Sequence, residues 1–349
     1  MSAPTSMERI GAALEGRLLD RVPYWIPATL HGARLLRTPL QAYFEDPHAV
    51  AEGQLRLRAL LGHDMLQAYP YVSVEHEAFG GETVFQADGP PVPGPPTLRL
   101  SRLGTLEAPD PTAVPALRRV LETTRALSSR ANGECLLMGA VMSPYSLPPM
   151  QLGLHVWLEL LHEAPADADR LLAVNERFTI AWALAQRAAG AGAITVIDPV
   201  GATDISSAAL QQRFALPSLR RTLTGIGAPA GVSHASARAL ARVDAVLEAG
   251  AGALVASMGE PLAAFRERTR GRAVLLGGLD SLAIHAGGAE DAARAVRAAL
   301  AAAAPCGGFV LYEHHGEIPY PVPLETLLAI AEAAQRFGRH PLTWAGAVA

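Results

Sequence analysis

The stretch GAGAITVIDPV, residues 190–200, shows the pattern that decides the fold. A helical pattern over residues 165–189 runs up to its first glycine, and a continuous apolar run then ends at Asp198. An apolar run without alternation indicates a strand that is buried on both faces, as in parallel sheets. The same unit recurs as GAGALVASMGEP (250–261) after a helix predicted over 236–249, and as GGFVLYEHHG (307–316) after a helix predicted over 289–303.

Five further apolar runs read as strands: RVPYWIPA (21–28), HDMLQAYPYV (63–72), ECLLMGAVMS (134–143), APAGVSH (228–234) and AVLLGGLD (273–280). Together these runs make about eight strands, each ending in polar residues. A closed (β/α)8 TIM barrel fits this count better than an open sheet, and no GxGxxG follows the first strand. We therefore expect one α/β barrel domain over 1–349, with a Gly/Pro-rich excursion at about 80–117 that is either a lid or a surface segment.

Two helices near the N-terminus carry capping signals. Thr5 and Glu8 form a capping box in front of an apolar pattern, and Asp46 with Pro47 marks the start of a second helix that runs to about residue 61.

The composition excludes several classes of protein. All 29 basic residues are arginine, so a Schiff-base lysine and the lysine of a phosphate-binding P-loop are both impossible. A net charge of −4 gives no basic surface for nucleic acid. No apolar run is long enough for a membrane span, and no signal peptide is evident. Two cysteines make no disulfide framework, so we expect a cytoplasmic protein.

Polar residues follow most of the predicted strands. In a barrel the carboxyl ends of the strands meet at one mouth, and there the chemistry takes place. The residues expected at this mouth are His31, Tyr69, Tyr71, Ser143, Tyr145, Asp198, Asp204, His234, Glu260, Asp280, Glu313, His314, His315 and Glu317.

The histidines suggest a metal site. His234 and His315 follow different strands, and with Glu313, Glu317 or Asp198 they could bind zinc or ferrous iron. The alternative is one solvated histidine and one hydrogen-bonded histidine. His314 is expected to point away from its neighbour, because successive residues at a strand end alternate in direction. Asp198 could instead form a turn before Pro199, and Asp280 could cap the next helix.

Several segments in order resemble the uroporphyrinogen decarboxylase-like superfamily. They are MERIGAALEGRLLDRVP (7–23), DPHAVAEGQLRLRALLGHDML (46–66), EHEAFGGETVFQADGPPV (75–92), ITVIDPVGATDISSAALQQRFALP (194–217) and GGFVLYEHHGEIPYPVPLETLLAIAEAAQRFG (307–338). The resemblance covers about residues 7–338 and implies a (β/α)8 barrel.

The resemblance involves two branches of the superfamily. The decarboxylase branch carries an arginine-rich loop where this chain reads IPATLHGARLLRTPL, which keeps Arg34 and Arg37 but lacks the RQAGR-like motif. His315 resembles the histidine of its GHG signature, and Tyr145 falls near its active-site tyrosine. The corrinoid and coenzyme M methyltransferase branch holds zinc by H-x-C and a later cysteine. Here His234 matches the histidine, while Ser236 and His315 stand at the two cysteine positions.

The resemblance is nearest to the methyltransferase branch. It implies methyl transfer between a corrinoid-type carrier, either free or bound to a carrier protein, and a small acceptor at a zinc or similar metal site. The alternative is a decarboxylase or other lyase acting on a small carboxylic acid or tetrapyrrole, with or without metal, and a third reading is a non-catalytic binding barrel. We predict catalytic roles for Tyr145, His315 and Asp198, substrate binding by His31, Arg34, Arg37, Tyr71 and Asp280, and a monomer or homodimer.

Overall fold

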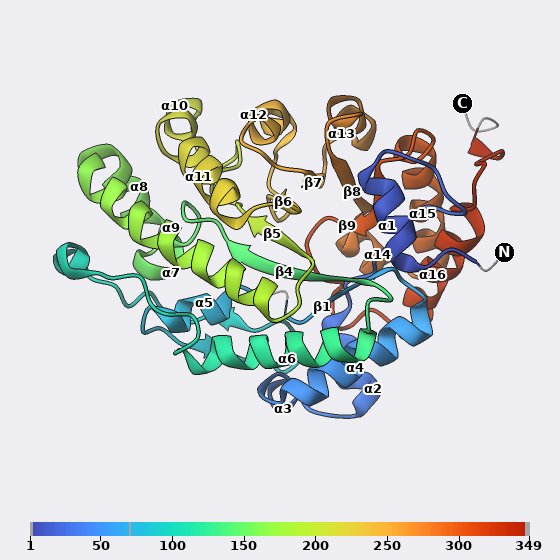
Figure 1. Ribbon diagram of the computed structural model, residues 1–349, viewed down its shortest axis with the longest axis horizontal. Coiled ribbons are helices and arrows are strands. Elements are labelled where there is room, and N and C mark those ends of the chain that lie inside the picture. The colour runs from blue at the N-terminus through green and yellow to red at the C-terminus, as the bar shows by residue number, and fades with distance from the viewer. Residues whose placement is uncertain (1–2, 70, 346–349) are drawn as a thin grey trace.

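The computed structural model describes residues 3–69 and 71–345 of the chain. Its centre is a curled, all-parallel sheet of seven strands surrounded by helices (Figure 1). In order across the sheet the strands are β1 (Met65–Gln67), β4 (Leu136–Met142), β5 (Ala193–Ile197), β6 (Ala230–Ser233), β7 (Ala253–Val255), β8 (Val274–Leu279) and β9 (Phe309–Glu313). A separate antiparallel pair consists of β2 (Thr83–Val84) and β3 (Val92–Pro93).

The helices cover the outside of the sheet. They are α1 (Ser6–Leu14), α2 (Thr29–Leu36), α3 (Leu40–Glu45), α4 (Pro47–Leu61), α5 (Ser73–Ala78), α6 (Pro115–Ala131), α7 (Pro148–Leu152), α8 (Leu154–Glu163), α9 (Pro165–Ala188), α10 (Ala208–Leu210), α11 (Leu216–Ile226), α12 (Val243–Glu248), α13 (Leu262–Thr269), α14 (Ser281–Gly287), α15 (Ala289–Ala303) and α16 (Leu324–Phe337). Short 3-10 turns η1 (Leu100–Thr105) and η3 (Leu240–Arg242) and a π-helical turn η2 (Gln211–Ala215) complete the elements.

Both predicted helix starts are confirmed. The Thr5 side chain accepts from the Glu8 amide and Glu8 accepts in return from Thr5, which is the full capping box of α1. Asp46 caps α4, and Pro47 occupies its first turn, where a missing N–H costs nothing.

One predicted helix differs from the structure. The helix expected from residue 236 begins only at Val243, after the short turn η3. Ala235 and Ser236 have left-handed backbone angles, with φ of 47° and 76°, and an L-residue in this region cannot open a right-handed helix.

Seven of the eight expected strands are present, and the first is the exception. Tyr24 makes a single parallel bridge to Leu311, with hydrogen bonds from Trp25 N to Leu311 O and from Leu311 N to Pro23 O. On its other side, Asp64 N donates to Tyr24 O at 2.9 Å. The segment thus lies between β9 and β1. Because Pro23 and Pro27 have no N–H to donate, it does not extend into a ladder.

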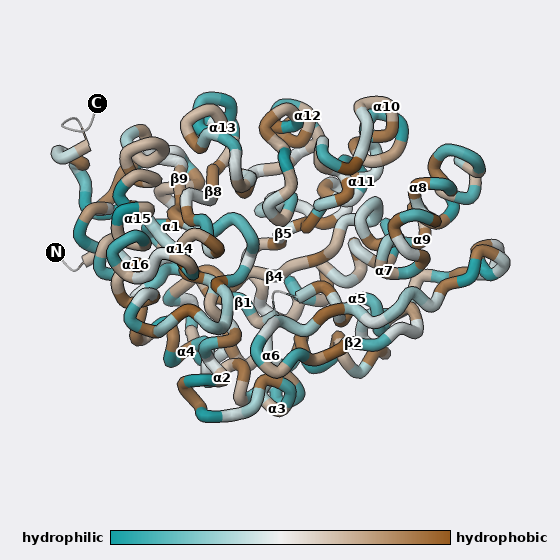
Figure 2. Tube along the Cα trace, turned by 180° about the vertical axis from the view of Figure 1, so that it is seen from behind, coloured by the Kyte–Doolittle hydropathy of each residue, from teal (hydrophilic) through white to brown (hydrophobic). Residues whose placement is uncertain are grey.

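Hydrophobic residues concentrate on the sheet and on the helix faces that cover it. In Figure 2 the tube is brown along β4 and β5 and teal at the outer turn of α13. The main core contains fully buried side chains from every layer, such as Leu66, Val141, Phe178, Leu275 and Leu300. None of the described helices combines the length and the apolar character that crossing a membrane requires.

Candidate functional site

A cavity of about 350 Å³ opens at the carboxyl ends of the strands. Gln67 at the end of β1, Ile197 at the end of β5, Ser233 at the end of β6 and Tyr312 on β9 all line it. Trp25 lies on the segment between β9 and β1 and stacks on Tyr312, with ring centroids 5.1 Å apart. The site is therefore at the end of the sheet where enzymes of this architecture place their chemistry.

One wall of the cavity comes from the Gly/Pro-rich excursion. Pro90, Pro91 and Pro93 line the cavity next to the residues of the strand ends. Proline fixes its own φ, so this wall has little backbone freedom. Part of the excursion therefore shapes the cavity.

Four buried polar atoms around this cavity have no hydrogen-bond partner. They belong to four lining residues: Tyr71 Oη, Ser73 Oγ, His315 Nε2 and Glu317 Oε2. Tyr71 and Glu317 nevertheless interact with each other, and Ser73 interacts with Tyr69. Buried polar groups in native proteins are normally well paired, so a group of such loosely paired side chains at one cavity favours a site for a polar ligand.

Glu317 is a buried carboxyl group at this site. Its Oε1 accepts from Leu30 N at 3.2 Å, and burial raises the pKa of the carboxyl well above its usual value. The neighbouring Glu313 also raises this pKa, because two nearby negative charges repel each other. Burial and the Glu317 carboxyl together raise the pKa of Tyr71 as well. Tyr71 therefore holds its proton at neutral pH, and the protonated form of Glu317 is favoured relative to a free carboxyl group.

His315 lies at the rim of the cavity between two polar groups. Its Nδ1 and the Ser236 hydroxyl are 2.6 Å apart, and its Nε2 lies 3.9 Å from Asp280 Oδ1. Burial lowers the pKa of His315, while the Asp280 carboxylate acts in the opposite direction. The ring is therefore predominantly neutral at pH 7 and can accept a proton.

The remaining residues of the EHHG corner point elsewhere. His314 Nδ1 is 2.7 Å from Ala256 O, and its side chain lines a different cavity beside α14 and α15. The expected alternation in direction between His314 and His315 is confirmed. Glu313 is fully buried outside the cavity lining and accepts from Gly316 N, and burial raises its pKa to about 8.

A second polar cluster lies behind the cavity wall. Asp198 accepts hydrogen bonds from Ser143 Oγ (2.6 Å), Ser146 Oγ (2.8 Å) and Arg242 Nη1 (3.2 Å). The same Nη1 lies 3.0 Å from His234 Nε2. All these side chains are buried. The cluster is an internal ion pair in which each contact satisfies a buried charge.

The expected metal site does not fit these contacts. The Arg242 guanidinium already sits against His234 Nε2, and a divalent cation there would face a like charge at short range. His315 instead uses Nδ1 for Ser236. Among residues 3–69 and 71–345, no three His, Cys, Asp or Glu side chains gather closely enough to bind a metal ion. The contacts of these residues therefore do not fit the predicted zinc or other metal site held by His234, His315, Glu313 and Glu317.

Several other predicted site residues lie outside the described lining of the cavity. Tyr145 is buried, pairs with Ser206 at 2.9 Å and packs against Trp157. His31 Nε2 lies 2.9 Å from Val322 O. Arg34 donates to the carbonyls of Val322 and Tyr320.

The two remaining predictions lie at helix ends. Asp280 is the N-cap of α14, with both capping bonds at 3.0 Å, as the alternative interpretation expected. Arg37 is an exposed C-cap residue of α2.

Other site residues had weak signals in the sequence. Ser73 follows Tyr71 by two positions, the spacing of residues that share a direction in extended chain. Trp25 falls inside the strand predicted over residues 21–28, and nothing in that apolar run indicates that its side chain lines a cavity. Arg242 had no signal, because only the folded chain brings it to Asp198.

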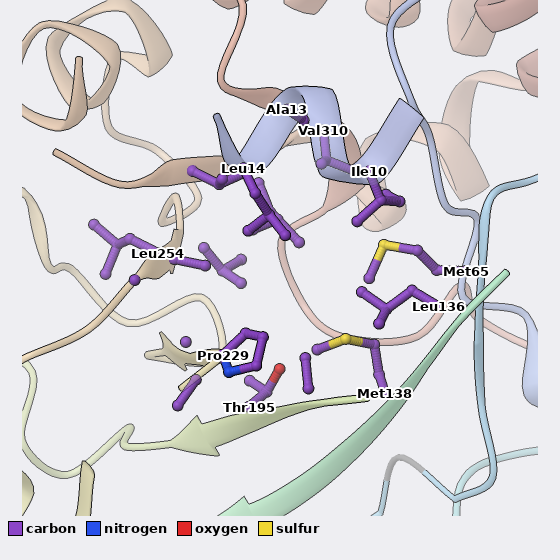
Figure 3. A pocket seen from close by; sticks show the side chains of 18 of the residues that line it. Ile10, Ala13, Leu14, Met65, Leu136, Met138, Thr195, Pro229, Leu254 and Val310 are labelled. Atoms are coloured by element: carbon purple, nitrogen blue, oxygen red, sulfur yellow. The ribbon is translucent and has the colours of Figure 1, made fainter. Parts of the chain in front are cut away.

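The cavity at the opposite end of the sheet is lined almost entirely by apolar side chains. A cavity of about 100 Å³ lies between α1 and the amino ends of the strands, and Figure 3 shows Leu14, Met65 and Met138 lining it. Thr195 supplies the one oxygen seen among the labelled side chains (Figure 3). This end offers packing surface and no cluster of acid or base groups.

Comparisons with known proteins agree with this architecture. The chain is 29% identical over 228 residues to a uroporphyrinogen decarboxylase from Syntrophotalea carbinolica, which covers 62% of this chain and 64% of that protein. It is 25% identical over 363 residues to one from Ralstonia pickettii, covering 97% of each.

Solved structures share the fold. A methyltransferase from Methanosarcina mazei matches with a TM-score of 0.83 at 20% identity, over 95% of this chain and 99% of that one. A B12-independent methionine synthase from Shewanella sp. W3-18-1 matches with a TM-score of 0.52 at 14% identity, over 96% and 95% of the chains. The family model for uroporphyrinogen decarboxylase (URO-D) matches residues 5–337, and the chain therefore belongs to this family of enzymes.

Proposed function

We propose that the chain is an acid–base lyase of the decarboxylase type that acts on a small carboxylic acid. The observation that carries the proposal is the group of loosely paired, buried polar side chains that line one cavity, namely Tyr71, Ser73, His315 and Glu317. A carboxylate that entered would find several neutral hydrogen-bond donors already in place.

The charge of the cavity supports a small substrate with one acidic group. No arginine belongs to its described lining, so a substrate with many carboxylates would lack counter-charges. A volume of about 350 Å³ is near the lower end for small-molecule sites, which span about 300–1,000 Å³. Both features disfavour a tetrapyrrole as the substrate.

In the proposed decarboxylation, the carboxyl group of Glu317 acts as the proton donor. When the bond between the substrate carbon and its carboxylate breaks, CO2 leaves and the electron pair stays on the carbon. Glu317 donates its proton to that carbon and becomes a carboxylate. Tyr71 and solvent return a proton afterwards. A buried acid with a raised pKa is suited to this step because burial favours its protonated form, which can donate.

The test is release of CO2 from a panel of small carboxylic acids, carried out in D2O. We expect turnover with deuterium incorporated at the carbon that loses CO2. Glu317→Gln removes the transferable proton, so kcat should fall by about 10²- to 10⁴-fold.

Glu75→Gln is the matched control. Glu75 is also buried, with a pKa raised to about 8, but it lies outside the described cavity lining. This variant should keep full activity. Absence of turnover with every acid, or equal activity of Glu317→Gln and the wild type, contradicts the proposal.

Methyl transfer is the second candidate, without the expected metal. Ser236 and His315 stand where the corrinoid methyltransferases have their two cysteines, and they contact each other. His315 could take the proton of a small thiol or hydroxyl acceptor, while a corrinoid carrier protein presents the methyl group at the mouth. Free methylcobalamin with a set of thiols tests this reaction. Loss of the methylcobalamin absorbance, without CO2 release from any acid, favours methyl transfer.

A further inference from the structure

The turn after β6 holds strained backbone next to the cavity. Ala235 and Ser236 are consecutive non-glycine residues in the left-handed region. This conformation costs about 1–2 kcal/mol per residue, and such strain clusters at functional sites. Ala235, His315 and Gly316 line the cavity, so the turn reaches its rim.

The strained turn presents a hydroxyl to a base. Ser236 Oγ is 2.6 Å from His315 Nδ1 and 3.5 Å from the His314 carbonyl. When the ring carries its hydrogen on Nε2, Nδ1 is free to accept the hydroxyl proton. In that tautomer the ring carries its hydrogen on Nε2, which lies 3.9 Å from Asp280 Oδ1. Asp280 is held in place because it caps α14.

We propose that Ser236 is a nucleophile for acyl transfer, with His315 as its base and Asp280 as a positioning residue. The substrates are small activated esters or thioesters. The arrangement places a serine hydroxyl 2.6 Å from one nitrogen of the histidine and a carboxylate 3.9 Å from the other, with the two ring nitrogens exchanged relative to the serine proteases. This activity is separate from the proposed lyase, because it does not use Glu317.

The proposed acyl transfer takes place in two stages, the acylation of Ser236 and the hydrolysis of the acyl-serine. Ser236 Oγ attacks the carbonyl carbon and its proton passes to His315 Nδ1. The resulting imidazolium is stabilised by the Asp280 carboxylate. The leaving alcohol or thiol takes that proton as the bond to the acyl carbon breaks. Water then attacks the acyl-serine, gives its proton to His315, and releases the acid as Ser236 recovers its hydrogen.

The test uses the whole chain and a small fluorophosphonate, followed by mass spectrometry, and a p-nitrophenyl acetate burst. We expect one label per chain, on Ser236, and a burst close to one equivalent. Ser236→Ala should lower the labelling rate by at least about 100-fold. Thr224→Val, a hydroxyl change on the exposed face of α11, should leave the rate unchanged. No label on the wild type, or equal labelling of Ser236→Ala, overturns the proposal.

Asp280→Asn tests the positioning role. Asparagine caps a helix as well as aspartate does, so the melting temperature should stay the same. Asp280 is the charged group that raises the pKa of His315, and His315 in turn lowers the pKa of its neighbour His314. Removing the Asp280 charge lowers the pKa of His315. We expect labelling about tenfold slower at neutral pH, with the acid limb of its pH profile moved to lower pH. An unmoved limb would contradict this role.

Discussion

At the scale of single residues, His234 and His315 have the same imidazole side chain but different surroundings and different roles. His234 lies against the Arg242 guanidinium inside an ion pair, while His315 lies at the rim with one unpartnered nitrogen. The difference comes from their neighbours. A cation beside an imidazole excludes a metal there, whereas a hydroxyl leaves the ring free to act as a base.

The buried pair of Asp198 and Arg242 gives a prediction about stability. Asp198→Asn leaves the guanidinium without its counter-charge, so the free energy of unfolding should fall by about 3–5 kcal/mol. Asp244 contacts Arg268 and Arg272 at the exposed surface, and Asp244→Asn should cost at most about 1 kcal/mol. Urea denaturation of both variants measures the difference. Equal losses of stability would show that removing the Asp198 charge does not leave an uncompensated charge on Arg242.

At this scale the sequence predicted which residues follow the strands, but it did not predict which of these residues contact one another. Ser236 stood out because it replaces an expected cysteine. Its contact with His315, 79 positions away, depends on how β6 and β9 are placed in the sheet. Metal ligation was inferred from residue types alone, and the position of Arg242 could not enter that inference.

At the scale of elements, local signals predicted most of the structure. Caps and apolar runs are properties of neighbouring residues, so α1, α4, α9, α15 and the strands β4 to β9 appeared near their predicted positions. The helix predicted from residue 236 started late, because a strained turn at the strand end overrides helix propensity there.

Helix α5 gives a prediction about pH. Glu75 is buried, its Oε1 accepts from Met142 N at 2.9 Å, and burial raises its pKa to about 8. The folded state therefore holds a proton that the unfolded state loses near pH 4.5. Its contribution to stability is complete below about pH 4.5 and is lost as pH rises to about 8.

Glu75→Gln should weaken this dependence. Glutamine keeps an acceptor for Met142 N but does not titrate. We expect the free energy of unfolding of the wild type to fall more steeply between pH 5 and pH 8 than that of the variant, in guanidinium denaturation at several pH values. Parallel curves would refute the assignment.

At the scale of the whole molecule, the chain closes its sheet with side chains as well as with backbone. Asp64 accepts from Arg21 at 2.6 and 2.8 Å and from Tyr24 N at 3.0 Å, and Arg9 lies 3.5 Å away. These contacts hold the segment between β9 and β1, where two prolines prevent a full strand. The apolar run alone did not reveal this, because it predicted a strand.

Asp64→Asn should loosen this closure. The buried arginine contacts lose their counter-charge, and stability should fall by about 3–5 kcal/mol. Hydrogen exchange should accelerate at the Trp25 and Leu311 amides, which bond across the closure. The Asp198 amide, which donates to Ser233 within the sheet, serves as the internal control. A uniform acceleration at all three amides would mean that only global stability has changed.

The stacked pair of Trp25 and Tyr312 has a practical consequence. Trp25 is the tryptophan in the cavity wall, whereas Trp157 and Trp182 are buried in the protein interior. Trp344 packs on Phe337 near the C-terminus, so a molecule that enters the cavity changes the surroundings of one indole and leaves the other three as they were. The protein thus carries its own fluorescent reporter, with which candidate substrates can be ranked by emission before any reaction has been identified.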